Sequence, residues 1–323
     1  HPDWAFTIPG RKPVRARYQL VLDYSRKEVV DGIFTQIAKV LDETKADYVK
    51  MDMNRHLTDV WSKTAGEQNQ GAILHRYMLG VYDFLERLHE RYPALLIEGC
   101  SGGGGRFDAG MLYYTPQIWC SDNTDAIERV KIQYGTSFAY PSCTVGSHVS
   151  AVPNHQTGRT TELATRAAVA MAGSFGYELD LNLLTEEEKE QVREQIKNYH
   201  RFEMLIRQGR YYRLTDVWQK KEYAAWEYCR PDGSEALVTV VTLDTQCNPA
   251  TEYVKLRGLG EDKKYRVEVV GMQTGGENGQ RINGTPNAVE PEYYTGAQLV
   301  HAGLPVPRLG NEYKSWQVYV KEV

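Results

Sequence analysis

Short apolar segments alternate with longer amphipathic segments over residues 1 to about 207 of the chain. Apolar residues that run together over a few positions predict strands, whereas apolar residues three or four positions apart predict helices. Strands that alternate with helices in this way favour parallel β/α units. The segments that we expect to form strands are residues 19–23, 48–52, 95–98, 117–120, 138–140 and 177–180.

Helix-spaced apolar residues lie between most of these strands, over residues 33–41, 74–85, 127–134 and 163–171. A further helix is expected to begin at Thr185, which three consecutive glutamates follow. A threonine side chain can accept a hydrogen bond from the first turn of a helix, and acidic side chains suit the positive end of the helix dipole.

Most of the expected strands end in polar or small residues, among them Asp23, Asp52, Glu98, Asp122 and Asp180. In a (β/α)8 barrel the carboxyl ends of the strands carry the chemistry. A doubly wound parallel sheet predicts the same pattern, and we find about six strands rather than eight. The pattern therefore indicates an α/β fold with functional groups at the strand ends, without choosing between the two architectures.

The pattern changes to all-β from about residue 210. Short alternating segments are separated by turns such as residues 231–234 and 258–260. This spacing is typical of a small antiparallel β-sandwich. We therefore expect two domains, an α/β domain over residues 1–207 and a β-sandwich over residues 208–323. The expected strands are residues 210–214, 222–228, 236–243, 253–256, 265–270 and 316–320.

Composition supports a globular protein and excludes several classes of function. The chain has 323 residues with 38 Lys and Arg against 42 Asp and Glu, which gives a formal net charge of −4. No basic block is present, so nucleic acid is not an expected partner. No apolar run approaches the ~20 residues that a membrane span needs, so no membrane partner is expected either.

Cysteine and histidine usage predicts no disulfide framework and no metal. The cysteines are odd in number and none are in C-x-x-C spacing, and the histidines show no paired spacing. A reducing cytoplasm is the simplest location for such a chain. The tripeptide at residues 283–285 matches a glycosylation sequon, which we interpret as a chance match. The cysteines are Cys100, Cys120, Cys143, Cys229 and Cys247.

Asp52 ends an expected strand and is flanked by Lys50, Asn54 and Arg55. A carboxylate beside two cations keeps a low pKa and stays ionised, which suits a nucleophile or an electrostatic stabiliser. A strand-end cluster of ion pairs would have the same pattern, so both interpretations stay open.

Two further segments follow strand ends. Residues 121–125 contain Asp122 and Asp125, of which one is expected to cap the next helix and the other to be free for function. Two carboxylates at different strand ends are the usual equipment for glycoside cleavage, although two helix caps would explain the segment as well. Residues 100–108 contain four consecutive glycines, which let backbone approach a ligand closely. They lack the pattern of a phosphate-binding loop, and a tight turn against a sugar is the better interpretation.

These segments together resemble the signatures of glycoside hydrolase family 36 α-galactosidases. Residues 50–55, 98–108 and 119–129 occur in the family's order and at plausible spacings. The opening residues 1–4, residues 17–23 and residues 131–137 also resemble the family. The likeness weakens in the β tail, which fits the family's C-terminal antiparallel domain.

The resemblance implies a role for each matching residue. Asp52 would be the nucleophile and Asp122 the general acid/base of a retaining mechanism. Met51 replaces the tryptophan usual in the family, and we expect this neighbour of Asp52 to face away from it and change only packing. The residues that match the galactose pocket are Arg17, Lys50, Cys100 and Gly103, with Asn54 as a supporting neighbour.

The resemblance also predicts the architecture. The family's N-terminal β domain and first barrel strands have no counterpart in this sequence, so we expect a partial (β/α)8 TIM barrel of about six β/α units, followed by the antiparallel β-sandwich. The abrupt start at His1, without Met or signal peptide, leads us to expect a C-terminal portion of a longer chain. The expected partners are α-galactosides and either the missing N-terminal part or further copies of the chain, a tetramer in the full-length form.

The implied activity is retaining hydrolysis of terminal α-linked galactose from melibiose- or raffinose-type oligosaccharides, and this mechanism implies no metal or organic cofactor. Two alternatives within this enzyme class are α-N-acetylgalactosaminidase and raffinose-type galactosyl transfer, the first governed by the room near Cys100 and Gly103. A third alternative is a carbohydrate-binding or assembly fragment with no catalysis of its own.

Overall fold

The computed structural model describes residues 1–247, 250–270, 292–307 and 312–323. The chain divides into two compact units, His1–Asp122 and Asn123–Val323. The possible glycosylation tripeptide at residues 283–285 lies outside the described residues.

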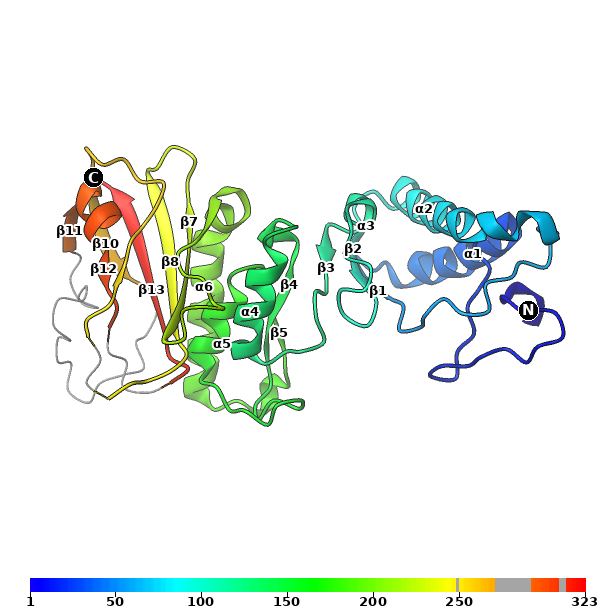
Figure 1. Cartoon of the computed structure of the whole chain (residues 1–323), viewed down its shortest axis with the longest axis horizontal. Helices are drawn as coiled ribbons and strands as arrows, with labels where there is room; N and C mark the ends of the chain where they lie inside the picture. Colours follow the sequence, from blue (N-terminus) through cyan, green and yellow to red (C-terminus); the bar gives the residue numbers. More distant parts are fainter. Residues whose placement is uncertain (248–249, 271–291, 308–311) are drawn as a thin grey trace. The chain divides into compact units, whose positions relative to one another are not determined.

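The first unit contains a parallel sheet of three strands in the order β1-β2-β3 (Figure 1). Helix α2 connects β1 to β2, and α3 connects β2 to β3, so this part of the chain forms the parallel β/α units that the sequence predicts. The elements are η1 (Pro2–Trp4), α1 (Lys27–Thr44), β1 (Tyr48–Asp52), η2 (Glu67–Ala72), α2 (Ile73–Arg91), β2 (Leu96–Cys100), α3 (Ala109–Tyr114) and β3 (Gln117–Ile118).

Helices α1 and α2 bury their apolar stripes in one core cluster with the sheet. Val49 and Met51 of β1 contact this cluster, together with Ile97 of β2. Because side chains alternate along a strand, Lys50 and Asp52 point to the opposite face of the sheet. Met51 therefore faces away from Asp52, as expected, and acts in packing. The buried helix residues of this cluster are Val30, Leu41, Ile73, Tyr77, Val81, Phe84, Leu85, Leu88 and Met111.

Residues 19–23 do not form the expected strand. They contribute two isolated bridges, Leu22 with Ala5 and Gln19 with Ala16. Two backbone hydrogen bonds join them to the N-terminal segment, from the Phe6 N–H to the Val21 carbonyl and from the Asp23 N–H to the Trp4 carbonyl. The Asp23 carboxylate accepts a hydrogen bond from the backbone N–H of Ser25, in the turn ahead of α1. Val21 is buried in the core cluster of the first unit, whereas Leu20 stays exposed, so the segment packs through an irregular pairing and not in a sheet.

The second unit begins with helix α4 and contains a parallel pair, β4 and β5, joined by helix α5. Helix α6 begins after Thr185, whose hydroxyl accepts from the Glu188 N–H while the Glu188 carboxylate accepts from the Thr185 N–H, so the predicted helix start is confirmed. The elements are α4 (Ala126–Thr136), η3 (Ser142–Thr144), β4 (Gly146–Ser150), α5 (Leu163–Ala170), β5 (Ser174–Glu178), η4 (Leu181–Leu183) and α6 (Glu186–Gln208).

The prediction of a strand at residues 138–140 is wrong. These residues form the turn after α4, with the Tyr140 N–H donating to the Thr136 carbonyl, and Phe138 stays largely exposed against Tyr134. The strand in this region is β4, whose sequence Gly-Ser-His-Val-Ser contains too few apolar residues to be recognised from its pattern.

The C-terminal part forms an antiparallel sheet of six strands in the order β11-β10-β13-β8-β7-β6, beside the two-stranded pair β12-β9 (Figure 1). Antiparallel strands from residue 210 onward are therefore confirmed. The elements are β6 (Arg210–Arg213), β7 (Tyr223–Cys229), β8 (Glu235–Thr242), β9 (Tyr253–Val254), β10 (Lys264–Val269), β11 (Glu292–Thr295), η5 (Gln298–Ala302), β12 (Leu304–Pro305) and β13 (Ser315–Glu322).

The two faces of this sheet are covered differently. One face packs on α6, where Phe202 and Ile206 join Trp226 and Tyr228 in one core cluster. The other face packs on the β9 and β12 segments in a second cluster. The sandwich thus has a thin second layer, and the helix preceding the sheet supplies the cover on its other side.

Glu227 on β7 is a carboxyl group with no exposed surface. One of its oxygens accepts from the backbone N–H of Arg257 at 2.9 Å. Burial raises the pKa of Glu227 from 4.5 to about 8, with the Arg257 hydrogen bond opposing the shift. A raised pKa means that the folded chain binds this proton more tightly than the unfolded chain does. The resulting stability is complete below about pH 4.5 and is lost as the pH rises through about 8.

Glu227→Gln is therefore expected to flatten the decline in the free energy of unfolding between about pH 5 and 8. The parent chain should lose up to about 1.4 kcal/mol per pH unit from this group. Denaturant unfolding at several pH values measures both slopes. Glu222→Gln is the matched control, because the pKa of Glu222 is lowered and its titration lies outside this range. Equal slopes for Glu227→Gln and the parent would contradict the prediction.

Candidate active site

The carboxyl ends of β1 and β2 bring together the side chains that the sequence singled out. The two strands pair in parallel with Lys50 opposite Glu98 and Asp52 opposite Cys100. All four side chains lie on the sheet face turned away from the helix core, and Lys50 and Asp52 are exposed there. The strand register therefore places a cation, a carboxylate and a thiol next to one another.

Asp52 is held in its ionised form by hydrogen bonds. Burial acts to raise the pKa of Asp52, but bonds from the Cys100 thiol, the Asn54 amide and backbone N–H groups outweigh it and leave the pKa below its usual range. The predicted direction is thus confirmed, while the cause differs from the expected one, the charges of Lys50 and Arg55. Burial raises the pKa of the Cys100 thiol to about 11. The thiol therefore stays protonated and donates a hydrogen bond to the Asp52 carboxylate.

Asn54 links Asp52 to the glycine segment. Its side-chain N–H donates to the Asp52 carboxylate at 2.5 Å, and its side-chain oxygen accepts from the Gly102 N–H at 2.9 Å. One amide thus fixes both the nucleophile candidate and the turn beside it, which is the supporting position that the sequence suggested.

The glycine segment makes a close turn against the residues around Asp122. Gly102 and Gly103 have positive φ angles of 53° and 86°, a region that other residues rarely adopt. A Cβ atom on Gly103 would lie 3.1 Å from the Asp122 nitrogen and from the Ser121 Cα. Glycine is therefore required by both backbone conformation and space, and Gly103 is brought beside Asp122.

Lys50, Trp119 and Asp122 form a connected group in the same unit. The Lys50 ammonium lies 3.4 Å from the centroid of the Trp119 ring and 3.7 Å from a carboxylate oxygen of buried Glu98. The Trp119 indole N–H donates to the Asp122 carboxylate at 3.0 Å. Trp119 and Glu98 were not selected from the sequence as functional residues, although Trp119 is only three positions before Asp122 and could have been recognised by that proximity.

Arg17 lies at the tip of a tight turn and is exposed. The structure attaches this turn to the chain directly after β1 through Arg55, whose guanidinium donates to the backbone carbonyls of Val14 and Gln19. Arg55 is thus not a charge partner of Asp52, as the sequence pattern suggested, but an anchor for the segment that contains Arg17.

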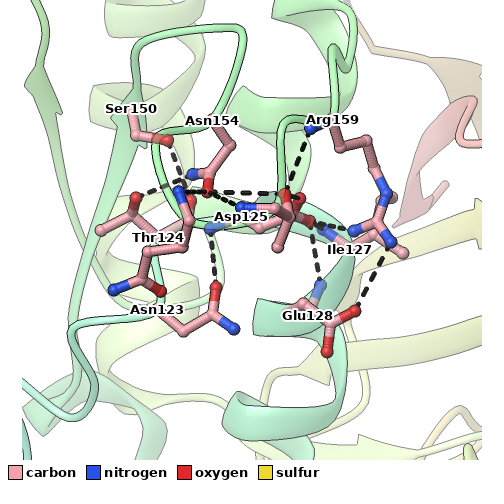
Figure 2. Close-up of polar contacts among 10 residues, drawn as sticks. Asn123, Thr124, Asp125, Ile127, Glu128, Ser150, Asn154 and Arg159 are labelled. Atoms are coloured by element: carbon pink, nitrogen blue, oxygen red, sulfur yellow. Dashed lines mark hydrogen bonds and ion pairs between the residues drawn. The ribbon is translucent and has the colours of Figure 1, made fainter.

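Asp125 is the helix cap that the sequence left open between two aspartates. It is buried and accepts from the N–H groups of Ile127 and Glu128 at the start of α4. Arg159 pairs with it at 2.5 Å (Figure 2). Burial acts to raise the pKa of Asp125, but Thr157, the Glu128 N–H and Arg159 together lower it. Asp125 is therefore engaged in structure, and Asp122 is the aspartate left exposed.

The segment around Asp125 is held by a second strand end. Ser150 at the end of β4 donates to the Thr124 carbonyl at 2.9 Å, and the Asn154 amide donates to the Thr124 hydroxyl at 3.0 Å (Figure 2). Both bonds fix Thr124, which lies two residues after Asp122. The start of α4 is thus tied to the loop after β4.

Metal and membrane features are limited to two findings. Within the described ranges, no three His, Cys, Asp or Glu side chains gather so that they could hold a metal ion. No helix in the described part of the chain is long and apolar enough to cross a membrane.

Comparison with protein families covers nearly the whole chain. The melibiase family model matches residues 1–209, and the model of the glycosyl hydrolase family 36 C-terminal domain matches residues 223–320. The chain belongs to glycosyl hydrolase family 36. The family resemblance found in the sequence is confirmed.

Curated and solved relatives in family 36 match the chain from end to end. The bifunctional α-galactosidase/sucrose kinase of Mediterraneibacter gnavus is 54% identical over 100% of this chain and 31% of its own length, and the structure of its galactosidase domain aligns with a TM-score of 0.88 over 41% of that domain. The α-galactosidase AgaA of Geobacillus stearothermophilus is 43% identical over 100% of this chain and 41% of its own length. Its complex with raffinose aligns with a TM-score of 0.90 over 42% of that structure. The chain thus spans about a third to two-fifths of these relatives.

Proposed function

We propose that the chain carries the catalytic pair of a retaining α-galactosidase, which removes terminal α-linked galactose from melibiose- and raffinose-type oligosaccharides. The observation that carries the proposal is the connected group at the strand ends. Asp52 is held ionised on β1. The ammonium of Lys50 on the same strand lies over the ring of Trp119, and the Trp119 indole N–H donates a hydrogen bond to Asp122.

The relatives support both the activity and the two aspartates. The M. gnavus and G. stearothermophilus proteins carry the name α-galactosidase, and the latter has been solved with raffinose and with stachyose. Those two complexes each carry a substituted aspartate. The two substituted positions are separated by the same number of residues along that enzyme's sequence as Asp52 and Asp122 are along this one.

The mechanism follows from the protonation states that each role requires. Asp52 attacks the anomeric carbon while Asp122, in its acid form, protonates the departing oxygen, and a β-galactosyl ester forms on Asp52. Asp122 then accepts a proton from water, which attacks the ester and releases galactose with its α configuration. Arg17, Lys50, Cys100 and Gly103 hold the sugar hydroxyl groups.

The parallel strands suit a partial (β/α)8 barrel over residues 1–207, followed by the antiparallel domain over residues 208–323. In a barrel, the face of β1 that carries Lys50 and Asp52 would line the interior. Its exposure in the first unit agrees with a barrel whose remaining strands would enclose this face. The catalytic assembly is then a homo-oligomer or a union with the other barrel strands. The cysteines are all free thiols, which suits a cytoplasmic location.

The function is tested in a complete-barrel polypeptide, meaning residues 1–323 fused behind the N-terminal region of the M. gnavus relative. We expect hydrolysis of p-nitrophenyl α-galactoside in clear excess over its 2-acetamido analogue, and α-galactose as the first product in NMR spectra. Preference for the analogue would favour the α-N-acetylgalactosaminidase alternative. β-Galactose as the first product would exclude a retaining mechanism.

Residues 1–323 on their own are expected to be poorly active or inactive. The β1 face that carries Asp52 is open to water, and loss of the groups that position a sugar is costly in rate. The measurement is hydrolysis of the aryl galactoside together with oligomeric state in solution. A monomer that turns over at rates typical of glycosidases, ~1–1000 per second, would contradict the need for further strands.

A further inference from the structure

The turn that carries Arg17 has a conformation that it does not adopt by preference. Arg17 and Tyr18 have positive φ angles of 51° and 60°, and the turn closes with the Gln19 N–H donating to the Ala16 carbonyl at 2.9 Å. Two consecutive residues of this kind favour Asn and Gly, because a larger side chain strains the backbone. Tyr18 is 97% exposed, so packing of its ring does not compensate the strain. Such a turn persists only where its surroundings hold it.

Arg55 holds the base of this turn. It is only 7% exposed, and its guanidinium donates to the Val14 carbonyl at 2.6 Å and to the Gln19 carbonyl at 3.2 Å. It also donates to the Thr58 hydroxyl at 2.7 Å. One planar group thus bridges both ends of the segment 14–19, which we call the Arg17 hairpin.

Asp59 holds the same hairpin from a second direction. Its carboxylate accepts from the Val14 N–H at 2.8 Å, so the N–H and the carbonyl of Val14 are both bound. The other Asp59 oxygen lies 3.7 Å from the Arg11 guanidinium. Asp59 is 9% exposed, and its own φ angle is positive at 52°. Two buried charged groups of the segment directly after Asp52 are therefore committed to the hairpin.

We propose that Arg55 and Asp59 are positioning residues that fix the Arg17 hairpin to the end of β1, so that the sugar-binding Arg17 and the nucleophile Asp52 stand on one rigid piece of backbone. The proposal rests on the proposed function for the sugar contact of Arg17. Lysine cannot replace Arg55, because a single ammonium lacks the planar fork that reaches both carbonyls at once.

The test is a double-mutant cycle in the complete-barrel polypeptide, with the dissociation constant for 1-deoxygalactonojirimycin as the readout. This compound was solved in complex with the G. stearothermophilus relative. Arg17→Ala should weaken binding by about a hundredfold and Arg55→Lys by about tenfold. In the Arg17→Ala background, Arg55→Lys should change binding less than about twofold, because the effect of Arg55 passes through Arg17.

Arg166→Lys is the matched control, since Arg166 is a buried arginine that likewise donates to two backbone carbonyls but belongs to the second unit. It should lower the melting temperature without changing the dissociation constant. If Arg55→Lys does not fold, Asp59→Gly tests the same hairpin, and glycine accepts the positive φ angle at that position.

The outcomes separate the two proposals. No effect of Arg17→Ala on binding would remove the sugar contact of Arg17, which belongs to the proposed function. A strong effect of Arg17→Ala with fully additive losses from Arg55→Lys would keep that contact and overturn the positioning role. An equal loss of affinity in Arg166→Lys would show that Arg55 acts only through general stability.

Discussion

Asp52→Ala is expected to lower the turnover of p-nitrophenyl α-galactoside by several orders of magnitude in the complete-barrel polypeptide. Alanine cannot form the covalent intermediate. The general acid Asp122 remains in place, but the variant has no side chain that can attack the anomeric carbon. Binding of a galactose analogue should change far less than turnover, because Lys50, Asn54 and the glycine turn keep their places. The loss would therefore appear in kcat and not mainly in KM.

Azide gives the decisive measurement for this variant. Removal of the carboxylate leaves room on the β face of the sugar, so added azide should partly restore turnover and yield β-galactosyl azide. Asp47→Ala is the matched control, because Asp47 is an exposed aspartate that directly precedes β1, at the opposite end of the strand from Asp52. Near-normal turnover of the Asp52→Ala variant without azide would overturn its assignment as the nucleophile.

Asp122→Asn is expected to slow substrates with poor leaving groups far more than activated aryl galactosides. Protonation of the departing oxygen matters less when the leaving group is already acidic. The kcat/KM for raffinose should therefore fall by several orders of magnitude, whereas the first step with a dinitrophenyl galactoside should slow much less. Because the indole N–H of Trp119 can still bind the amide oxygen, the substituted side chain keeps its place. The measurement is kcat/KM over a series of leaving groups.

Asp125→Asn is the control that separates chemistry from helix capping. The substitution weakens the buried ion pair with Arg159 and the N-terminal cap of α4. It should therefore lower the melting temperature and reduce kcat/KM by the same factor for all substrates. Equal losses across leaving groups in Asp122→Asn, or a graded loss in Asp125→Asn, would move the general acid away from Asp122.

Local pattern was sufficient for the elements whose residues agree with their surroundings. Helices α1 and α2 have apolar stripes that meet one core, and Thr185 with Glu188 closes the capping box that the sequence predicts. It failed where tertiary contacts replaced periodicity. Residues 138–140 are apolar but form the turn after α4. β4 is a polar strand whose Ser147 hydroxyl donates to Gln133 and whose His148 ring lies against the Glu178 carboxylate.

The candidate site divides in the same way. Asp52, Lys50, Cys100 and Gly103 could be named from a motif, because strand ends and glycines leave a clear local signature. The partners of each charge could not be named. Arg55 is three residues from Asp52 yet binds the hairpin at residues 14–19, and Trp119 joins Lys50 to Asp122 across β1 and β3.

The sequence by itself determined the family, the parallel β/α character of the first part, the antiparallel strands that follow and the identity of the two candidate aspartates. These depend on periodicity and on short motifs, which are local properties of the chain. Only the tertiary structure decided which aspartate caps α4, why the pKa of Asp52 is low and what Arg55 holds. Those answers depend on hydrogen bonds between segments far apart in sequence, and a charged side chain selects such partners by geometry and burial, not by its neighbours along the chain.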